Sequence, residues 1–530
     1  MNTTKLTHLL LFILILVISI PIFRHGLWDA HDALAHFQRA VSVFEEVKNQ
    51  QFPPLFNYWT PGQLGYSWQI FYPPLSSILI LIFGALTGFS DAFITIKITY
   101  IFIFSLTACS SYISCYLFTK DKVSAAICSA LYISSAYFIN NAYTRAALGE
   151  LLAMSFMPLL IAGLVFFVNN NSKRWILPFS AGMIFLSNIP SFVICLIFSL
   201  IYLAINFKKI LNLNNFKIAI IWFSLLLLVT LFYWAPLIYQ YRNSDIYAFS
   251  GLKRTYETMY NYSYNVKDVI SLRSANTGLT AKGMYVTPGL IVILTSTILI
   301  ITASTKLPKI GICAIIFLTM STNLFPWYLI SNKVPLLSLA QFPWRAISIA
   351  TAGLCIISSL YIGNISKKLP NLAPAIVLLC IFSAFPVMKK AYETRLSSFN
   401  MQFIFNDYLT MNSLNNKKAI MKAFADGHYN YAKISSFRKG YPIFEVCSSK
   451  TTEIETPVIW YSGYKIRTSG NEISSYKSKN GLLSLTPLKG CHEYLLNFDN
   501  RINLYSLIIS FITCTLILGV SIVRVRKRAQ

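Results

Sequence analysis

Residues 28–39, WDAHDALAHFQR, bring two aspartates, two histidines and an arginine into twelve positions. Elsewhere such chemistry is scarce, because only 12% of the 530 residues are charged and 55% are hydrophobic. If this segment is helical, Asp29, Asp32, His36 and Arg39 share one face. A carboxylate shielded from bulk water can act as a general base, with Asp32 or Asp29 in that role. His36 and Arg39 would then bind a phosphate.

Two other interpretations of the same residues stay open. The acids can cap the helix and pair with Arg39, which would leave a simple interfacial helix. A divalent metal could also bind Asp29, His31, Asp32 and His36, although their spacing matches no fixed ligand pattern.

Further polar residues stand at the expected outer ends of apolar runs. The stretch NNAYTRAALGE contains Arg145 and Glu150, and QFPWR contains Gln341 and Arg345. The arginines can grip a lipid phosphate while Glu150 supplies a second acid and Gln341 contacts the substrate. Equally, Glu150 can complement a helix dipole, and the arginines can anchor their helices at the interface.

The elements that would position these residues are apolar runs of spanning or near-spanning length. They lie at about 6–23, 74–90, 93–118, 123–141, 150–168, 175–187, 189–206, 218–240, 286–303, 309–321, 345–363, 371–387 and 505–523. From the run at 93 onward, Lys and Arg collect in every second connection and in the tail RVRKRAQ, which predicts that those connections and both termini are cytoplasmic. Both termini on one side require an even number of crossings. We therefore expect about twelve transmembrane helices and assign the short run 74–90 to a juxtamembrane segment.

This threading predicts a multi-pass cell-membrane protein whose long loops are extracytoplasmic. Residues 1–387 would form the membrane domain, with an amphipathic helix over 31–49 that lies against the outer face. Residues 388–504 contain alternating stretches such as YPIFEV and an Asn480-Gly481 turn, which indicate a small α+β or β domain. Residues 505–530 would form the last transmembrane helix and a basic tail.

The remaining composition narrows the class of protein. The net charge is +26, but no basic face on a water-soluble fold accompanies it, so nucleic acid is not an expected partner. Cys447 and Cys491 lie in the extracytoplasmic segment, where a disulfide and two free thiols are both open. The segment between 49 and 75 is rich in proline and aromatic residues. It could form a rigid surface for a sugar or isoprenoid chain, or pack against the interface.

Several ordered motifs resemble known families. HDALAHFQR, QFPP, GYSWQIFYPPL, YTRAALGELLAMSFMPLLIAGL and AQFPWRAISIATAGL are similar to bacterial 6-pyruvoyl-tetrahydropterin synthase-related membrane proteins, which are close to YfhO-like proteins. The stretches IWYSGYKIRTSGNEI and NGLLSLTPLKGCHEYLLNF are similar to the C-terminal β domain of the YfhO-like group.

The architecture also resembles the GT-C class of membrane glycosyltransferases. This resemblance implies an essential acid in the first outer loop, at Asp32 or Asp29, followed by a juxtamembrane helix, at 74–90. It further implies a polyprenyl-phosphate-linked sugar donor, an envelope polymer as acceptor and membrane lipids as partners. A divalent metal is a possible cofactor. The alternatives are a transporter or flippase of a lipid-linked envelope precursor, or a non-catalytic membrane scaffold that docks partners through its β domain.

Overall fold

The computed structural model describes residues 3–59, 64–211, 213–250, 255–271, 273–276, 283–302, 309–330, 335–394, 405–418, 420–421 and 432–529. The chain divides into two compact units, each built from three separate stretches of sequence. The first unit comprises Met1–His36, Phe93–Phe223 and Arg254–Ser397. The second unit comprises Phe37–Ala92, Ser224–Lys253 and Ser398–Gln530. The sequence boundaries expected at 387 and 504 stay predictions.

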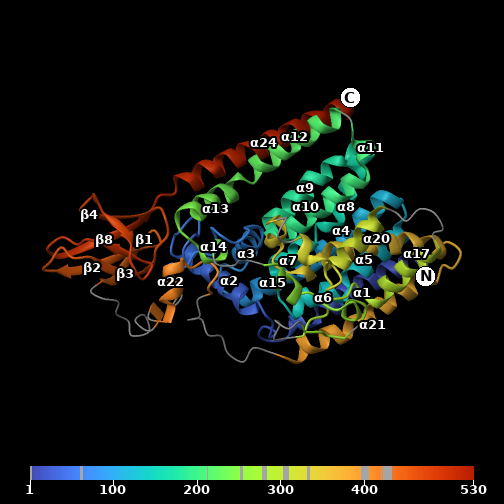
Figure 1. The fold of residues 1–530 in the computed structure, drawn as a ribbon, viewed down its shortest axis with the longest axis horizontal. Coiled ribbons are helices and arrows are strands. Elements are labelled where there is room, and N and C mark those ends of the chain that lie inside the picture. Colours follow the sequence, from blue (N-terminus) through green and yellow to red (C-terminus); the bar gives the residue numbers. More distant parts are fainter. Residues whose placement is uncertain are drawn as a thin grey trace. The chain divides into compact units, whose positions relative to one another are not determined.

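Helices make up most of the described chain (Figure 1). The helices up to residue 210 are α1 (Thr3–Phe23), α2 (Ala33–Lys48), α3 (Leu75–Leu86), α4 (Ala92–Thr119), α5 (Lys122–Ile133), α6 (Ala136–Tyr143), α7 (Leu148–Met154), α8 (Met157–Val168), η1 (Ser172–Trp175), α9 (Ile176–Ser187), α10 (Ile189–Ile205) and α11 (Phe207–Ile210). Those that follow are α12 (Leu213–Val229), α13 (Leu231–Asn243), α14 (Tyr247–Ser250), α15 (Tyr256–Asn261), α16 (Val266–Ile270), α17 (Leu290–Thr302), α18 (Lys309–Met320), α19 (Trp327–Ile330), η2 (Pro335–Ala340), η3 (Pro343–Arg345), α20 (Ala346–Ser366), α21 (Leu372–Glu393), α22 (Met411–Asn415) and α24 (Arg501–Ala529).

Each apolar run predicted from the sequence corresponds to a helix or a pair of helices, but fewer of them than expected are long enough to cross a membrane. By length and composition, six helices of the described residues can do so, or eight if each of two bent pairs is one span. Four other apolar helices are shorter: Leu75–Leu86, Ile189–Ile205, Leu290–Leu299 and Lys309–Met320. At 1.5 Å per residue, a helix needs about 20 residues to cross a hydrocarbon core of about 30 Å. The six to eight described helices that are long enough to cross a membrane are therefore fewer than the expected number of about twelve.

Local sequence explains where the membrane helices begin and how closely they pack. Asp121 caps α5 by accepting the Ser124 amide at 3.0 Å, and Asn188 caps α10 by accepting the Ser191 amide at 2.9 Å. A Cβ atom at Gly363 of α20 would lie 1.9 Å from Ser124 Oγ, so only glycine lets these two helices meet. Small residues at such contacts are typical of helices packed within a membrane.

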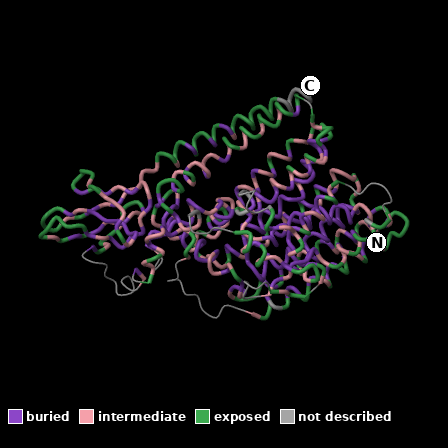
Figure 2. Tube along the Cα trace, in the orientation of Figure 1, coloured by how far each residue is buried: buried purple, intermediate pink, exposed green. Residues whose placement is uncertain are grey.

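Two helices of the second unit contrast with this tight packing. The spanning part of α24 is only 17% buried, and Figure 2 shows the helix that leads to the C-terminus exposed along most of its length. Its partner α13 follows α12 after a bend of 72°. At that bend Ser510 Oγ of α24 donates to Leu228 O at 2.9 Å and accepts from Phe232 N at 3.0 Å. This hydroxyl satisfies backbone groups that the break in the helix releases.

The second unit also contains the predicted β domain. Its strands are β1 (Ala432–Arg438), β2 (Tyr441–Ser448), β3 (Ile454–Ile459), β4 (Tyr464–Thr468), β5 (Asn471–Ile473), β6 (Ser475–Lys477), β7 (Leu482–Leu485) and β8 (Gly490–Phe498). They form a five-stranded sheet in the order β1-β2-β8-β4-β5 and a three-stranded sheet in the order β3-β7-β6, and the pairs reported are antiparallel. The predicted Asn480-Gly481 turn is confirmed between β6 and β7, where Gly481 has φ +78°. The protein is thus a multi-span α-helical membrane protein with a small β-rich domain.

The aromatic segment after α2 packs against this β domain. Phe56 is fully buried, and its ring centroid lies 4.8 Å from that of Phe498 and 5.0 Å from that of Tyr464. Gln51 ties the segment to the turn between β1 and β2, because its Nε2 donates to Gly440 O at 3.1 Å. Of the two interpretations of this segment, close packing describes these side chains, although they pack on protein and not on a lipid interface.

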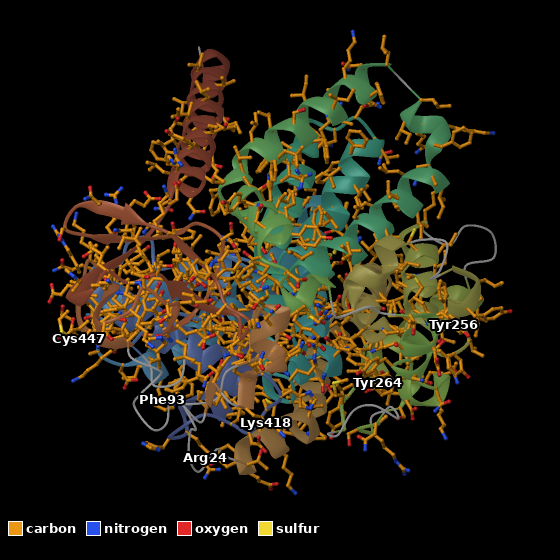
Figure 3. All side chains as sticks on the ribbon, turned by 60° about the vertical axis from the view of Figure 1, so that its left-hand side comes forward. Arg24, Phe93, Tyr256, Tyr264, Lys418 and Cys447 are labelled. Carbon is orange, nitrogen blue, oxygen red and sulfur yellow. A yellow bond between two sulfur atoms is a disulfide. The ribbon has the colours of Figure 1, made fainter. Side chains whose placement is uncertain are left out.

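A disulfide joins Cys447 and Cys491. Of the two states that the sequence left open for these cysteines, the structure has the bridge and not two free thiols. The two cysteines face each other across neighbouring strands β2 and β8, and both are exposed. Cys447 is labelled at the margin of the strands in Figure 3. The other eight cysteines are free, and most of them are buried as small apolar side chains.

Candidate functional site

The turn between α6 and α7 in the first unit presents Arg145. The amides of Thr144 and Arg145 both donate to Asn140 O at 2.9 Å, which ends α6 sharply. The next residue, Ala146, has φ +52°, a left-handed conformation that costs energy for a residue with a side chain. This conformation reverses the chain at once, so that Arg145 lies directly before α7 and the Glu150 that α7 carries.

Glu150 joins Arg145 to Arg345, although these arginines are 200 residues apart in the sequence. Its Oε2 accepts from Arg145 Nη1 at 2.6 Å and from Arg345 Nε at 2.9 Å. Its Oε1 accepts from Tyr137 Oη at 2.7 Å and from Asn141 Nδ2 at 3.3 Å. Four hydrogen bonds satisfy a carboxylate that is only 1% exposed, which a buried charge requires.

Arg345 comes from the short helix η3 at the start of α20. Its Nη1 donates to Gln341 Oε1 at 2.6 Å and to Ala340 O at 3.3 Å. Its guanidinium carbon lies 5.1 Å from the ring centroid of Phe342. Gln341 itself has φ +64°, so each of the two arginines lies near a left-handed residue other than glycine. These contacts leave the Arg345 side chain little freedom.

Both guanidinium groups nevertheless have N–H groups that these contacts do not use. Arg145 Nε and Nη2, and Arg345 Nη2, have no hydrogen-bond partner within the part of the chain that the structure describes. Burial alone would lower the pKa of Arg145, but the Glu150 carboxylate raises it, so this guanidinium stays charged. Two fixed cations with spare donors form a ready binding site for an anion.

Asp32 lies beside this pair of arginines. Its amide donates to Arg145 O at 2.8 Å, and its own carbonyl accepts the His36 amide at 3.1 Å. The half-buried carboxylate makes no side-chain hydrogen bond or ion pair with any described residue. Burial raises its pKa above the ordinary value, Arg145 and Arg345 oppose that rise, and Glu150 adds to it. An ionised carboxylate of this kind is available to accept a proton.

His36 lies on α2 as expected and makes a contact that the sequence did not predict. It is 5% exposed, and its Nε2 accepts the amide of Leu148 at 3.3 Å. That ring nitrogen contacts the start of α7 and does not point a free N–H at a phosphate. Neighbouring His31 is exposed, and its amide donates to Thr144 O at 3.2 Å.

Asp29 lies outside the helix that was expected to align it with Asp32. The helix α2 begins at Ala33, and Asp29 precedes it in a stretch without regular secondary structure, so helical spacing does not relate the two acids. The described residues contain no group of three or more His, Cys, Asp or Glu side chains that could hold a metal ion.

Arg39 belongs to the second unit. It is 1% exposed, and its guanidinium lies 3.6 Å from the ring centroid of Tyr72. Its Nη2 donates to Ser77 Oγ at 2.8 Å and to Ser76 Oγ at 3.2 Å, both at the start of α3. Burial lowers the pKa of this guanidinium, and the neighbouring tyrosines oppose the effect. These contacts hold Arg39 in place among neutral side chains.

Two residues of the site were missed by the sequence analysis. Tyr137 and Asn141 stand four apart on α6 and complete the coordination of Glu150. Asn140 and Asn141 form an adjacent pair of amides inside an apolar run, which is rare enough within a membrane span to have served as a signal.

Comparisons with known proteins leave the family open. No family model matches the chain, and no curated protein matches it. Among solved structures, the chain is similar to the crystal structure of ArnT from Cupriavidus metallidurans bound to undecaprenyl phosphate. The TM-score is 0.38 and the identity 12%, over 80% of this chain and 73% of that chain. So distant a likeness carries no argument about function. Membership of the pterin synthase-related, YfhO-like or GT-C groups stays a prediction.

Proposed function

We propose that the protein is a membrane glycosyltransferase that takes a sugar from a polyprenyl phosphate and transfers it to a hydroxyl of a cell-envelope polymer. The observation that carries this proposal is the Asp32 carboxylate. It has no side-chain partner among the described residues, and it lies in the field of Arg145 and Arg345. An open base beside cations with unused donors suits a displacement that expels a phosphate.

The reaction would run as a single displacement. Asp32 takes the proton of the acceptor hydroxyl while the hydroxyl oxygen attacks the anomeric carbon. The bond from that carbon to the phosphate oxygen breaks, and the lipid phosphate leaves with the bonding electrons. Arg145 and Arg345 stabilise the charge on the leaving phosphate through their unused donors. One displacement inverts the configuration at the anomeric carbon.

Glu150 has a supporting part in this mechanism and not the part of a second acid. Its four hydrogen bonds occupy both carboxylate oxygens, so it is poorly placed to exchange a proton with a substrate. It fixes the two arginines at one point and offsets part of their mutual repulsion. Gln341 acts on the substrate through Arg345, whose Nη1 it holds. Arg39 is not required in this scheme.

We further propose that the reaction takes place on the extracytoplasmic face, with both termini in the cytoplasm. The disulfide between Cys447 and Cys491 supports this orientation, because such bonds persist in oxidising compartments. Impermeant thiol reagents applied to intact cells after mild reduction should label these two cysteines. Labelling only after cell lysis would reverse the orientation.

The function is tested by mass spectrometry of envelope polymers from cells that carry the gene, lack it, or carry Asp32→Asn. We expect one glycan modification to disappear in the last two cases at equal protein levels. The same modification should be lost when purified protein is given the lipid-linked donor and Asp32→Asn replaces the native chain. An unchanged glycan profile in cells without the gene would reject the proposal.

A second candidate function is translocation of a lipid-linked precursor. Two pairs of apolar helices, α5 with α6 and α12 with α13, are bent by 47° and 72°. Broken helices of this kind are frequent in transporters. Purified protein in vesicles that moves a labelled polyprenyl-phosphate sugar between leaflets, without consuming it, would favour this function over transfer.

A further inference from the structure

Residues 31–36 are joined to residues 144–148 by three hydrogen bonds within the first unit. The amide of His31 donates to Thr144 O at 3.2 Å, and that of Asp32 donates to Arg145 O at 2.8 Å. In the third bond, the Leu148 amide at the start of α7 donates to His36 Nε2 at 3.3 Å. His36 supplies the only side chain among these three bonds.

The third bond is one of two that the same amide makes, because Leu148 N donates to Ala146 O at 2.9 Å as well as to His36 Nε2 at 3.3 Å. The residue before the helix is Ala147, which has no side chain able to cap it. The first amides of a helix lack partners within the helix and need an acceptor from elsewhere. For Leu148, Ala146 O is the nearer acceptor, and the buried His36 ring adds a second one from another part of the chain.

This contact requires an uncharged imidazole. A ring nitrogen that accepts a hydrogen bond carries no proton, so the proton of His36 must be on Nδ1. Adding a second proton would turn Nε2 into a donor facing the Leu148 N–H. It would also put a positive charge at the positive end of a helix. Both effects would break the third bond.

The position of Asp32 depends on this contact. Asp32 lies one helical turn before His36 and is bonded to it through the backbone, while its own amide is bonded to Arg145 O. On the joined segments, residues 31–36 and 144–150, the other charged or titratable groups are His31, Asp32, Arg145 and Glu150. Further along α2 come Arg39, Glu45, Glu46 and Lys48. We infer that His36 is a positioning residue that, while uncharged, holds residues 31–36 against the start of α7 and so keeps Asp32 beside the two arginines. The inference rests on the proposed role of Asp32 as base.

The test compares His36→Gln, His36→Leu and the native chain, all full length in detergent or nanodiscs. Glutamine can reach with an oxygen to the position of Nε2 and does not gain a proton near neutral pH. Leucine has a similar size but no acceptor. The matched control is His25→Gln, because His25 is exposed and follows α1. Histidine changes its charge between about pH 5 and 8, which sets the range to be scanned.

The first measurement is hydrogen exchange of the peptide around residue 148 at pH 5.5 and 7.5, corrected for intrinsic rates. The native chain and the His25→Gln control should lose protection at the lower pH, whereas His36→Gln should not. His36→Leu should be less protected than His36→Gln at both values, because only the bond from Leu148 N to Ala146 O remains. Equal protection of the native chain and His36→Gln at both values would overturn the inference. This readout needs no substrate, so it stands even if the proposed transfer reaction fails.

The second measurement is the pH profile of transfer from the polyprenyl-phosphate sugar. His36→Leu should lower kcat about tenfold, which is what the loss of one buried hydrogen bond allows. His36→Gln should stay within about threefold of the native chain at pH 7.5 and should lose less activity on acidification. Identical pH profiles for His36→Gln and the native chain would contradict a positioning role. Transfer that survives Asp32→Asn would instead refute the proposed function.

Discussion

The two units hold buried charges in different ways. In the first unit, Arg145 and Arg345 share one oxygen of Glu150, and opposite charges meet at 2.6 and 2.9 Å. A free carboxylate, that of Asp32, lies in their field. The four groups sum to zero charge, yet, counting only partners in the described part of the chain, the arginines have unused donors and Asp32 has unused acceptors.

In the second unit, the contacts seen for two buried ionisable side chains are to hydroxyl groups and rings. Arg39 donates to the hydroxyls of Ser76 and Ser77, and Glu46 accepts the hydroxyl of Ser42 at 2.6 Å. Both residues are 1% exposed. Burial raises the pKa of Glu46 from its ordinary value near 4.5 to about 8, so this carboxyl is mostly protonated at neutral pH.

This difference suggests that the buried charged groups of the first unit serve a binding or catalytic role, whereas those of the second unit stabilise the fold. A network of opposite charges can receive a new anion because its members are already ionised and oriented. A buried guanidinium that contacts hydroxyls and a ring, as Arg39 does, is solvated by the fold in place of water. We therefore expect substitutions in the first unit to change catalysis or break the network, and substitutions in the second unit to change stability.

The largest effect is expected for Asp32→Asn. Without a base to accept the hydroxyl proton, transfer should fall by roughly 10²–10⁴-fold, while the melting temperature changes little. Asp29→Asn is the matched control, because Asp29 lies outside α2 and is not among the charges that shift the pKa of Asp32. Initial rates with a lipid-linked donor measure the effect. Equal losses in both variants would mean that Asp32 is not the base.

The pH dependence of that rate follows from the same group. Because the pKa of Asp32 is raised, the base is protonated at a higher pH than an exposed aspartate would be. The acid side of the rate profile should thus begin to fall nearer to neutral pH. Rates that stay constant down to the range of an ordinary aspartate would contradict the assignment.

Glu150→Gln should have the next largest effect. It keeps the shape but leaves two buried guanidinium groups without their counterion, and breaking a buried pair costs about 3–5 kcal/mol. Thermal unfolding in detergent measures it. Glu45→Gln is the control, since Glu45 forms an exposed pair with Lys48 at 3.5 Å, and such pairs contribute at most about 1 kcal/mol. Similar melting shifts in the two variants would show that the Glu150 network does not stabilise the fold.

Glu46→Gln should give a smaller, pH-dependent effect. A raised carboxyl pKa means that the folded state holds its proton more tightly than the unfolded state. Stability from this group is complete below about pH 4.5 and is lost as the pH rises through about 8. Glutamine does not titrate, so the variant should gain roughly 2–4 kcal/mol relative to the native chain between about pH 5 and 8. Melting curves that stay parallel across this range would contradict the raised pKa.

The sequence predicted the helices better than the spans. Apolar composition was enough to locate helices because burial in lipid or protein demands it. The number of crossings depended on breaks, such as the one at Thr230, that have no strong sequence signal. One serine of α24, Ser510, bonds to the backbone at that break and lies 280 positions after Thr230 in the sequence. A local sequence pattern cannot predict such a distant contact.

The site was predictable in its members and not in their roles. The proximity of Arg145, Glu150 and Arg345 agrees with the sequence prediction that they stand at the same end of their apolar runs. The contact of His36 with Leu148 did not, because it depends on how two distant segments meet. Arg39 shares a helical spacing with Asp32, but burial decided its surroundings, and sequence spacing does not report burial.

Arg39→Lys should have the smallest effect and is the sharpest test of the contrast between the units. Lysine keeps the charge but loses the flat group that stacks on Tyr72 and reaches both serines, so stability should fall by about 1–2 kcal/mol. Transfer below the melting temperature should stay within about threefold, whereas Arg345→Lys should lower it more than tenfold, because a donor to the leaving phosphate is lost. If Arg39→Lys lowers transfer as far as Arg345→Lys does, then Arg39 binds substrate after all. The buried charges of the second unit would in that case also take part in catalysis, and burial among neutral groups would be no guide to role.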